Sequence, residues 1–177
     1  MTPRLIGSRR VFDGQVIGVR LDEIELPSGR RMVAEIVEHR GAVAIVPVTA
    51  SGEVLLVRQF RHAVGRELLE VPAGTIEPGE PPDVCARREL AEEVGCAAAR
   101  WDRLLSFYPS PGVMSEELYV YLARELSPRP THREEEDLRV EPRPLVDARR
   151  LVSSGEVCDA KSIIGLLAAC DRLGVAR

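Results

Sequence analysis

Residues 74–96 read GTIEPGEPPDVCARRELAEEVGC and contain the most informative pattern in the chain. From Asp83 onward apolar residues recur at helical spacing, among them Val84, Leu90, Ala91 and Val94. Pro82 or Asp83 suits the first turn of a helix, and Gly95 suits the position just past its end. The stretch therefore predicts a loop, a helix of about three turns and a second loop.

The predicted helix carries an acidic face. Glu89 and Glu93 are four residues apart and lie on the same side, with Glu92 beside them. Like charges at this spacing destabilise a helix slightly, and a divalent cation would compensate them. Carboxylates without a neighbouring histidine or cysteine suit Mg²⁺ or Mn²⁺. On the glutamates alone, a solvated acidic helix face remains the more common interpretation.

The spacing of the whole stretch favours the metal. The order Gly74, five residues, Glu80, seven residues, Arg88-Glu89-Leu90, one residue, Glu92-Glu93, one residue, Gly95 and an apolar Cys96 resembles the Nudix box at every defined position. The resemblance implies a Nudix-type α/β/α sandwich around a mixed β-sheet. It also implies hydrolysis of a nucleoside diphosphate linked to a further group, with two or three divalent ions.

The resemblance also assigns roles within the box. Glu89 and Glu93 are the expected principal metal ligands, Glu92 is a further ligand or catalytic group, and Arg88 orients the carboxylates through charge-assisted hydrogen bonds. Gly74 is expected to let the backbone turn tightly after a strand, which would bring the Ala73 carbonyl near the metal. The expected supporting residues of the box are Gly74, Glu80 and Gly95.

The segments outside the box resemble the ADP-ribose pyrophosphatase branch of the family. Ser110-Pro111-Gly112 places a proline sixteen residues after Gly95, although Ser-Pro-Gly is also an ordinary turn signal. Arg58 and Arg61 are candidates for contacts to the diphosphate or the base, because a guanidinium suits phosphate recognition. Two surface arginines on a strand are the alternative, and Glu70 is a weaker candidate substrate contact.

The segment HREEED at 132–137, with an acidic run at 134–137, lies where this branch carries a mobile loop with a catalytic glutamate. Glu134 and Glu136 are the candidate general bases, although the repetitive run does not distinguish them from Glu135. A carboxylate acting as a base must come within ~3 Å of the attacking water, directly or through another water. A solvated charge run is the alternative.

The rest of the chain predicts an α+β fold. Residues 42–48 form a continuous apolar run typical of a strand buried on both faces, and residues 159–174 predict an amphipathic helix. Residues 1–40 predict a small β region with a hairpin turn at 27–30, and by resemblance it is a dimerisation element. Residues 41–177 are then the Nudix domain.

Composition limits the class of protein. The chain has 177 residues, 45% hydrophobic content and a net charge of -4, which favours one main globular domain and gives no support to nucleic-acid or membrane-surface binding. Its longest apolar runs are shorter than the ~20 residues of a membrane helix. The four cysteines lack paired spacing and are expected to be free, mostly buried thiols of a cytoplasmic protein.

We therefore expect a Mg²⁺-dependent pyrophosphatase that converts ADP-ribose to AMP and ribose 5-phosphate. The same box would serve another nucleoside diphosphate sugar, such as a GDP- or UDP-sugar, or a broad range of them. A module that senses a nucleotide without cleaving it is a further alternative, because a fold does not determine a function.

Overall fold

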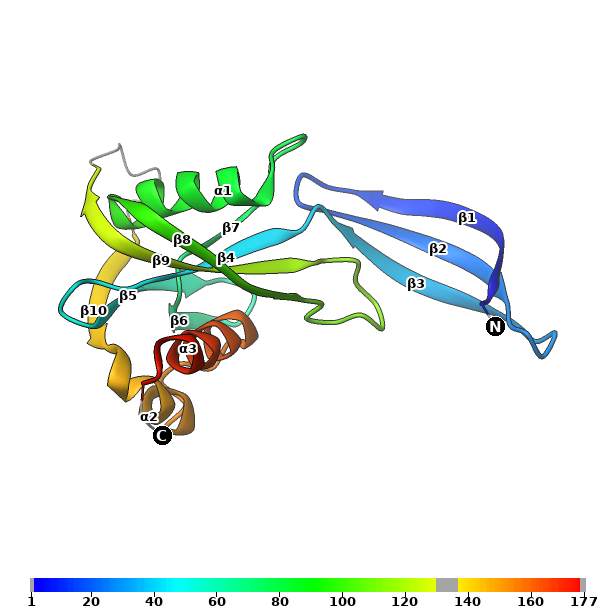
Figure 1. The fold of residues 1–177 in the computed structure, drawn as a ribbon. Helices are drawn as coiled ribbons and strands as arrows, with labels where there is room; N and C mark the ends of the chain where they lie inside the picture. The colour runs from blue at the N-terminus through cyan, green and yellow to red at the C-terminus, as the bar shows by residue number, and fades with distance from the viewer. Residues whose placement is uncertain (1, 130–136, 176–177) are drawn as a thin grey trace. The chain divides into compact units, whose positions relative to one another are not determined.

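The computed structural model describes residues 2–129 and 137–175 (Figure 1). Its contacts divide the chain into two compact units. One unit contains Met1–Gly41 and Tyr108–Glu117, and the other contains Ala42–Phe107 and Leu118–Arg177. The smaller unit thus takes in residues 108–117 in addition to the N-terminal β region.

The first unit is a three-stranded antiparallel sheet in the order β1-β2-β3. Its strands are β1 (Arg4–Asp13), β2 (Ile17–Glu25) and β3 (Arg31–His39). The turn at 27–30 joins β2 to β3, with Gly29 at a φ of 82°, a value that glycine adopts without strain. Residues 108–117 add to β3, because the Val37 amide donates to the Val113 carbonyl at 2.7 Å.

The second unit contains two sheets. A mixed sheet has the order β7-β4-β9-β8, in which β4 and β9 are parallel and the other pairs are antiparallel. An antiparallel sheet has the order β10-β5-β6. The strands are β4 (Ala42–Pro47), β5 (Glu53–Arg61), β6 (Arg66–Glu70), β7 (Ala73–Thr75), β8 (Cys96–Phe107), β9 (Leu118–Pro128) and β10 (Arg139–Pro144).

The central strand β4 is buried along its whole length. Side chains of successive strand residues point to opposite faces, so β4 contributes to two separate cores. Ala44 and Val46 pack in one core with residues of α2 (Ala148–Ser153) and α3 (Ala160–Leu173). Val43 and Ile45 pack in the other with α1 (Pro82–Glu89).

Helices α1 and α3 accordingly lie on opposite sides of the mixed sheet (Figure 1). This arrangement confirms the predicted α+β class and the α/β/α sandwich. Within the described ranges, no helix is both long enough and apolar enough to cross a bilayer.

The helix boundaries follow the local sequence signals. Pro82 opens α1, where its missing N–H removes no intrahelical bond, and Gly95 ends the helical segment with a φ of 72°. In α3 the Asp159 side chain accepts a hydrogen bond from the Ser162 amide, and Gly174 follows the last turn with a φ of 65°.

One part of the predicted helix differs in detail. Residues Leu90–Val94 form a π-helical turn rather than a continuation of α1. Such turns are wider than the α-helix and are frequent at functional sites. Here the turn carries Glu92 and Glu93.

The four cysteines are free, as expected. Cys85 and Cys170 are buried, Cys96 is half-buried and Cys158 is exposed.

Candidate active site

The box folds as a strand, a loop and a helix that bring its charged side chains together. β7 supplies Ala73 and Gly74, the loop supplies Glu80, and the helical segment supplies the remaining glutamates. Glu89 is the last residue of α1, and Glu93 lies in the π-helical turn. Both are 9% exposed, which is unusual for glutamate.

Arg88 lies at the centre of the carboxylates. Its guanidinium donates to both oxygens of Glu80, through Nε and Nη2, at 3.0 Å each. Its Nη1 donates to Glu89 Oε1 at 2.6 Å and to Glu92 Oε2 at 2.9 Å. Such charge-assisted bonds are short and directional, so a single arginine fixes three carboxylates.

Glu80 is the one of these three carboxylates that Arg88 engages through two hydrogen bonds. The hydrogen bonds from Arg88, opposed by partial burial and helped by the Glu77 amide, lower the pKa of Glu80 to about 2. The same pairing raises the pKa of the Arg88 guanidinium. Glu80 therefore stays ionised, and it holds the Arg88 side chain to the loop that precedes α1.

Residue 74 must be a glycine because the Glu89 side chain packs closely against it, and not because the backbone turns there. A Cβ atom at residue 74 would lie 1.9 Å from the carboxyl carbon of Glu89. Gly74 lies inside strand β7 and does not have a positive φ, so the expectation of a tight turn at this residue was wrong. The glycine instead leaves the space that the Glu89 carboxylate occupies.

Glu89 and Glu93 have different surroundings. Burial raises the pKa of Glu89 in spite of the neighbouring Arg88, which shows that its charge is incompletely compensated. Glu93 Oε2 accepts a hydrogen bond from the Ala73 amide at 2.9 Å, which ties the end of the helical segment to β7.

The chemistry of these donors fits a divalent cation. The guanidinium of Arg88 donates to three box carboxylates and the fourth, that of Glu93, accepts from a backbone amide; oxygen donors of this kind suit Mg²⁺ or Mn²⁺. Within residues 2–129 and 137–175, no three acidic, histidine or cysteine side chains already converge on one point. Arg88 instead bridges Glu89 and Glu92 directly.

The two candidate arginines outside the box are held in ion pairs. Arg58 on β5 donates to both oxygens of Glu141 on the neighbouring strand β10, at 2.6 and 3.3 Å. Arg61 donates through Nε and Nη2 to Glu70, with a closest distance of 2.6 Å. The sequence carries no signal for Glu141, because it lies 83 residues from its partner.

Glu70 has a second cationic partner that the sequence analysis also missed. Lys161 Nζ donates to Glu70 Oε2 at 2.6 Å and to Asp159 Oδ1 at 2.8 Å. Burial acts to raise the pKa of Glu70, but the hydrogen bonds and charges of Arg61 and Lys161 outweigh it and hold the pKa below its usual range. The Glu70 side chain is 1% exposed and remains ionised.

The remaining candidates are not part of the described residues of the second unit. Ser110, Pro111 and Gly112 belong to the first unit, where the Ser110 carbonyl accepts from the amides of Val113 and Met114 in the expected turn. Glu134 and Glu136 lie outside the described residues.

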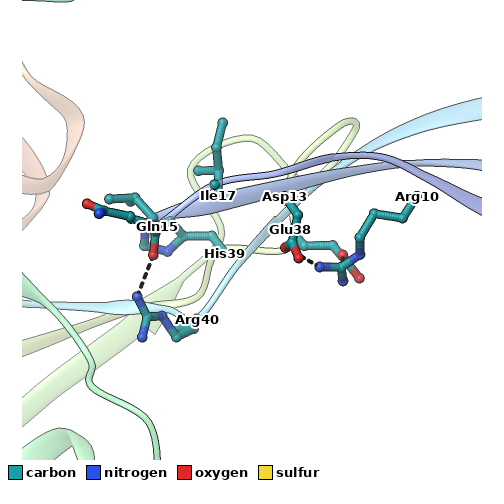
Figure 2. Close-up of a pocket in the computed structure, with 10 residues that line it drawn as sticks. Arg10, Asp13, Gln15, Ile17, Glu38, His39 and Arg40 are labelled. Atoms are coloured by element: carbon teal, nitrogen blue, oxygen red, sulfur yellow. Dashed lines mark hydrogen bonds and ion pairs between the residues drawn. The ribbon is translucent and has the colours of Figure 1, made fainter.

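The first unit also contains a pocket of 440 Å³, shown in Figure 2. Arg10 on its wall pairs with Asp13 at 2.7 Å and with Glu38, and Arg40 donates to the Gln15 carbonyl at 2.8 Å. Among the described residues that line it, these charged groups are thus partly neutralised by one another. The sequence gives no signal for this pocket, because its residues come from two separate stretches of chain, 10–18 and 38–40, that meet at one end of the three-stranded sheet.

Comparison with known proteins identifies the family. The sequence model of the NUDIX domain family matches residues 38–162 of this chain, a range that includes the whole box.

The chain belongs to the Nudix hydrolase family.

Its relatives include ADP-ribose pyrophosphatases. The chain is 42% identical over 162 residues to the ADP-ribose pyrophosphatase of Bacillus subtilis (strain 168), covering 90% of this chain and 88% of the relative. It is 40% identical over 167 residues to the ADP-ribose pyrophosphatase of Mycobacterium tuberculosis (strain ATCC 25618 / H37Rv), covering 92% and 81%. These matches confirm the resemblance to that branch of the Nudix family.

The fold has a solved counterpart. The crystal structure of an ADP compounds hydrolase has a TM-score of 0.88 and 25% sequence identity to this chain, over 99% of this chain and 98% of the other. Nudix hydrolases generally use divalent metal ions, which agrees with the carboxylate donors of the box.

The Glu80–Arg88 pair predicts a pH-dependent stability. Because the pKa of Glu80 falls to about 2 on folding, its stabilisation is fully present above the ordinary pKa near 4.5 and is lost as the pH falls through about 2. Glu80→Gln should lower the free energy of unfolding by ~1–3 kcal/mol at pH 7, and the deficit should shrink between pH 5 and pH 2. Urea unfolding in EDTA measures it.

Glu77→Gln is the matched control, because Glu77 is an exposed glutamate of the same loop. We expect a change within about 0.5 kcal/mol. A Glu80→Gln deficit that is equal at pH 7 and pH 3 would contradict the assignment.

Proposed function

We propose that this Nudix hydrolase cleaves the diphosphate bond of ADP-ribose to give AMP and ribose 5-phosphate, with Mg²⁺ or Mn²⁺. The observation that carries diphosphate hydrolysis is the intact set of box carboxylates around Arg88. ADP-ribose is supported by the two ADP-ribose pyrophosphatases that resemble nearly the whole chain.

The box residues divide the work of holding two or three ions. Glu89, Glu92 and Glu93 are the proposed carboxylate ligands, and the Ala73 carbonyl is a further one. Bound divalent ions neutralise diphosphate charge and lower the pKa of the attacking water. Arg88 holds Glu89 and Glu92 in place, while Glu80 anchors Arg88 from the other side.

The general base is proposed to come from the acidic run. Glu134 and Glu136 are the candidates, and Glu92 is a further catalytic candidate. A glutamate from a loop suits this task, because loop closure can deliver the carboxylate to the water. Glu134→Gln and Glu136→Gln, measured separately, distinguish them, since loss of the general base should lower kcat far more than loss of the other glutamate.

The proposed substrate contacts lie outside the box. Arg61 keeps 38% of its side chain exposed beside buried Glu70, so its outer face can contact an anionic substrate. Arg58 is a weaker candidate, because Glu141 already engages it through two bonds. Glu70 and the Ser110-Pro111-Gly112 turn complete the proposed set.

Two alternatives lead to different outcomes. Another nucleoside diphosphate sugar would use the same box, so only a comparison of substrates separates it from ADP-ribose. A nucleotide sensor without turnover would have no need of the complete set of charged box residues, which argues against it. The expected location in the cytoplasm and the expected absence of nucleic-acid and membrane partners stay predictions.

The first unit is proposed to mediate a homodimer. Every residue of β1 is exposed, and large apolar side chains on this unit include Leu5 at 59%, Phe12 at 54% and Val33 at 57% exposure. Exposed apolar side chains gathered on one small sheet are typical of a protein interface.

A substrate panel tests the proposed function. ADP-ribose should exceed GDP-mannose, UDP-glucose, NADH and diadenosine polyphosphates by at least about tenfold in kcat/KM, with AMP as a product, because specificity is this ratio. Chromatographic separation of products under Mg²⁺ gives the measurement. A flat profile or a preference for a GDP- or UDP-sugar would support the first alternative, and tight binding without turnover would support the sensor.

Glu93→Gln tests the metal ligands. The amide keeps the size of the side chain but removes the charge, so kcat should fall roughly 100-fold or more under Mg²⁺. Glu77→Gln removes the same charge from an exposed position of the box loop and should keep wild-type kcat. Full turnover of Glu93→Gln would remove Glu93 from the metal site.

Light scattering tests the dimer. The mass should be twice the 19.5 kDa of one chain. Val33→Glu should shift it toward the monomer, because a charge is costly to bury in an apolar interface. Val146→Glu, at a 72% exposed position of the second unit, is the control that should leave the mass unchanged. A wild-type mass of 19.5 kDa would refute the dimer.

A further inference from the structure

Residues 70–73 run from the last residue of β6 to the first residue of β7, and we call them the strap. Pro72 has no N–H, so the strap cannot continue as a regular strand. Its backbone is instead fixed at three points. The Val71 amide donates to Ser162 Oγ at 2.8 Å, the Pro72 carbonyl accepts from the Ile45 amide at 2.8 Å, and the Ala73 amide donates to Glu93 Oε2 at 2.9 Å.

The strap therefore joins the first turn of α3 to a carboxylate of the box. Ser162 is fully buried and supplies the hydroxyl at one end. Ala73 and Glu93 lie at the other end. A displacement at Ser162 must pass along three residues to reach Glu93, and the bond from Ile45 limits movement between them.

Glu70, the first residue of the strap, is fixed by its side chain. Its carboxylate is 1% exposed and lies between the guanidinium of Arg61 and the ammonium of Lys161. Two cations, Arg61 and Lys161, and two carboxylates, Glu70 and Asp159, make up this ion-pair network.

Lys161 is the only lysine of the chain. The other 23 residues of the Lys and Arg total of 24 are arginines. Its position explains the exception. The ammonium donates in two directions, to Glu70 at 2.6 Å and to Asp159 at 2.8 Å, from a side chain that is 15% exposed. A compact tetrahedral donor suits this place better than the planar fork of arginine.

The first turn of α3 is itself held firmly. Asp159 Oδ1 accepts from the Ser162 amide at 3.1 Å and from Lys161 Nζ, so one carboxylate fixes both residues that touch the strap. Side-chain capping of this kind stabilises a helix start.

We propose that Lys161 and Ser162 are positioning residues of the active site. Through the strap they set the places of Ala73 and Glu93, although neither lies among the box carboxylates. This inference rests on the proposed diphosphatase function and deepens it, by extending the machinery from the box to α3 near the end of the described chain.

Ser162→Ala tests the proposal. The variant removes the acceptor of the Val71 amide, so the strap should shift and loosen Glu93. We expect kcat to fall about tenfold with KM for ADP-ribose within about twofold, since small misplacements of catalytic groups act on the chemical step. Binding of Mn²⁺ alone to the substrate-free protein, followed by electron paramagnetic resonance of free Mn²⁺, should weaken about threefold or more by the same reasoning.

Cys170→Ala is the matched control. Cys170 is buried in the same helix and packs in the same core, but its thiol contacts the Leu145 carbonyl rather than the strap. It should lower Tm and leave Mn²⁺ affinity and kcat at the wild-type values when both are measured well below Tm. Equal losses in Ser162→Ala and Cys170→Ala would overturn the proposal, as would wild-type Mn²⁺ affinity and kcat in Ser162→Ala.

Lys161→Gln and Lys161→Arg provide a second route if Ser162→Ala does not fold. Kcat and Mn²⁺ affinity should decrease in the order wild type, Lys161→Arg, Lys161→Gln, because arginine keeps the charge but not the shape. A Lys161→Gln protein with wild-type values of both would overturn the role of Lys161.

The Mn²⁺ measurement separates the two hypotheses. If the wild-type protein binds Mn²⁺ but does not cleave ADP-ribose, the proposed substrate is wrong, while the comparison of Mn²⁺ affinities still decides the positioning role. If ADP-ribose is cleaved and the variants match the wild type, only the positioning role is wrong.

Discussion

The close approach of Glu89 to Gly74 is the constraint on which the site depends. The carboxylate at the end of α1 occupies the space where a side chain of β7 would begin. This contact sets the distance between helix and strand at the box, and it buries a charge that Arg88 only partly compensates. The position of α1 on one face of the mixed sheet is therefore fixed relative to β7, the edge strand that it covers.

Around this contact, the protein arranges charge in two linked groups. In the first group, Arg88 donates to carboxylates of the helical segment of the box. In the second, Arg61 and Lys161 donate to Glu70 at the end of β6. The strap lies between the two groups and bonds to Glu93 at its far end. Buried ionic groups of this kind contribute little net stability compared with apolar packing. Their main effect is therefore to fix the positions of the box glutamates.

Local patterns made much of the fold predictable. The continuous apolar run of β4, the helical spacing of α1, and the glycines at 95 and 174 each depend on neighbouring residues, and each was found. Strand β1 was not located within its β region, because all its residues are exposed and no buried face imposes an alternating pattern. The π-helical turn after Glu89 also has no marker in the sequence.

The box was predictable because the family fixes its spacing, but its surroundings were not. Arg58 and Glu141 pair across 83 residues, and Glu70 and Lys161 pair across 91. The register of β5 with β10 brings Arg58 next to Glu141, and the packing of α3 on the mixed sheet brings Lys161 next to Glu70. Periodicity within a short window carries no information about either.

The single lysine gives the protein a built-in spectroscopic reporter. Protein grown with isotope-labelled lysine would show one side-chain ammonium signal, and that signal would come from the buried network beside the strap. Nuclear magnetic resonance could then follow the electrostatics of this interior position without any substitution, tag or assignment of overlapping peaks.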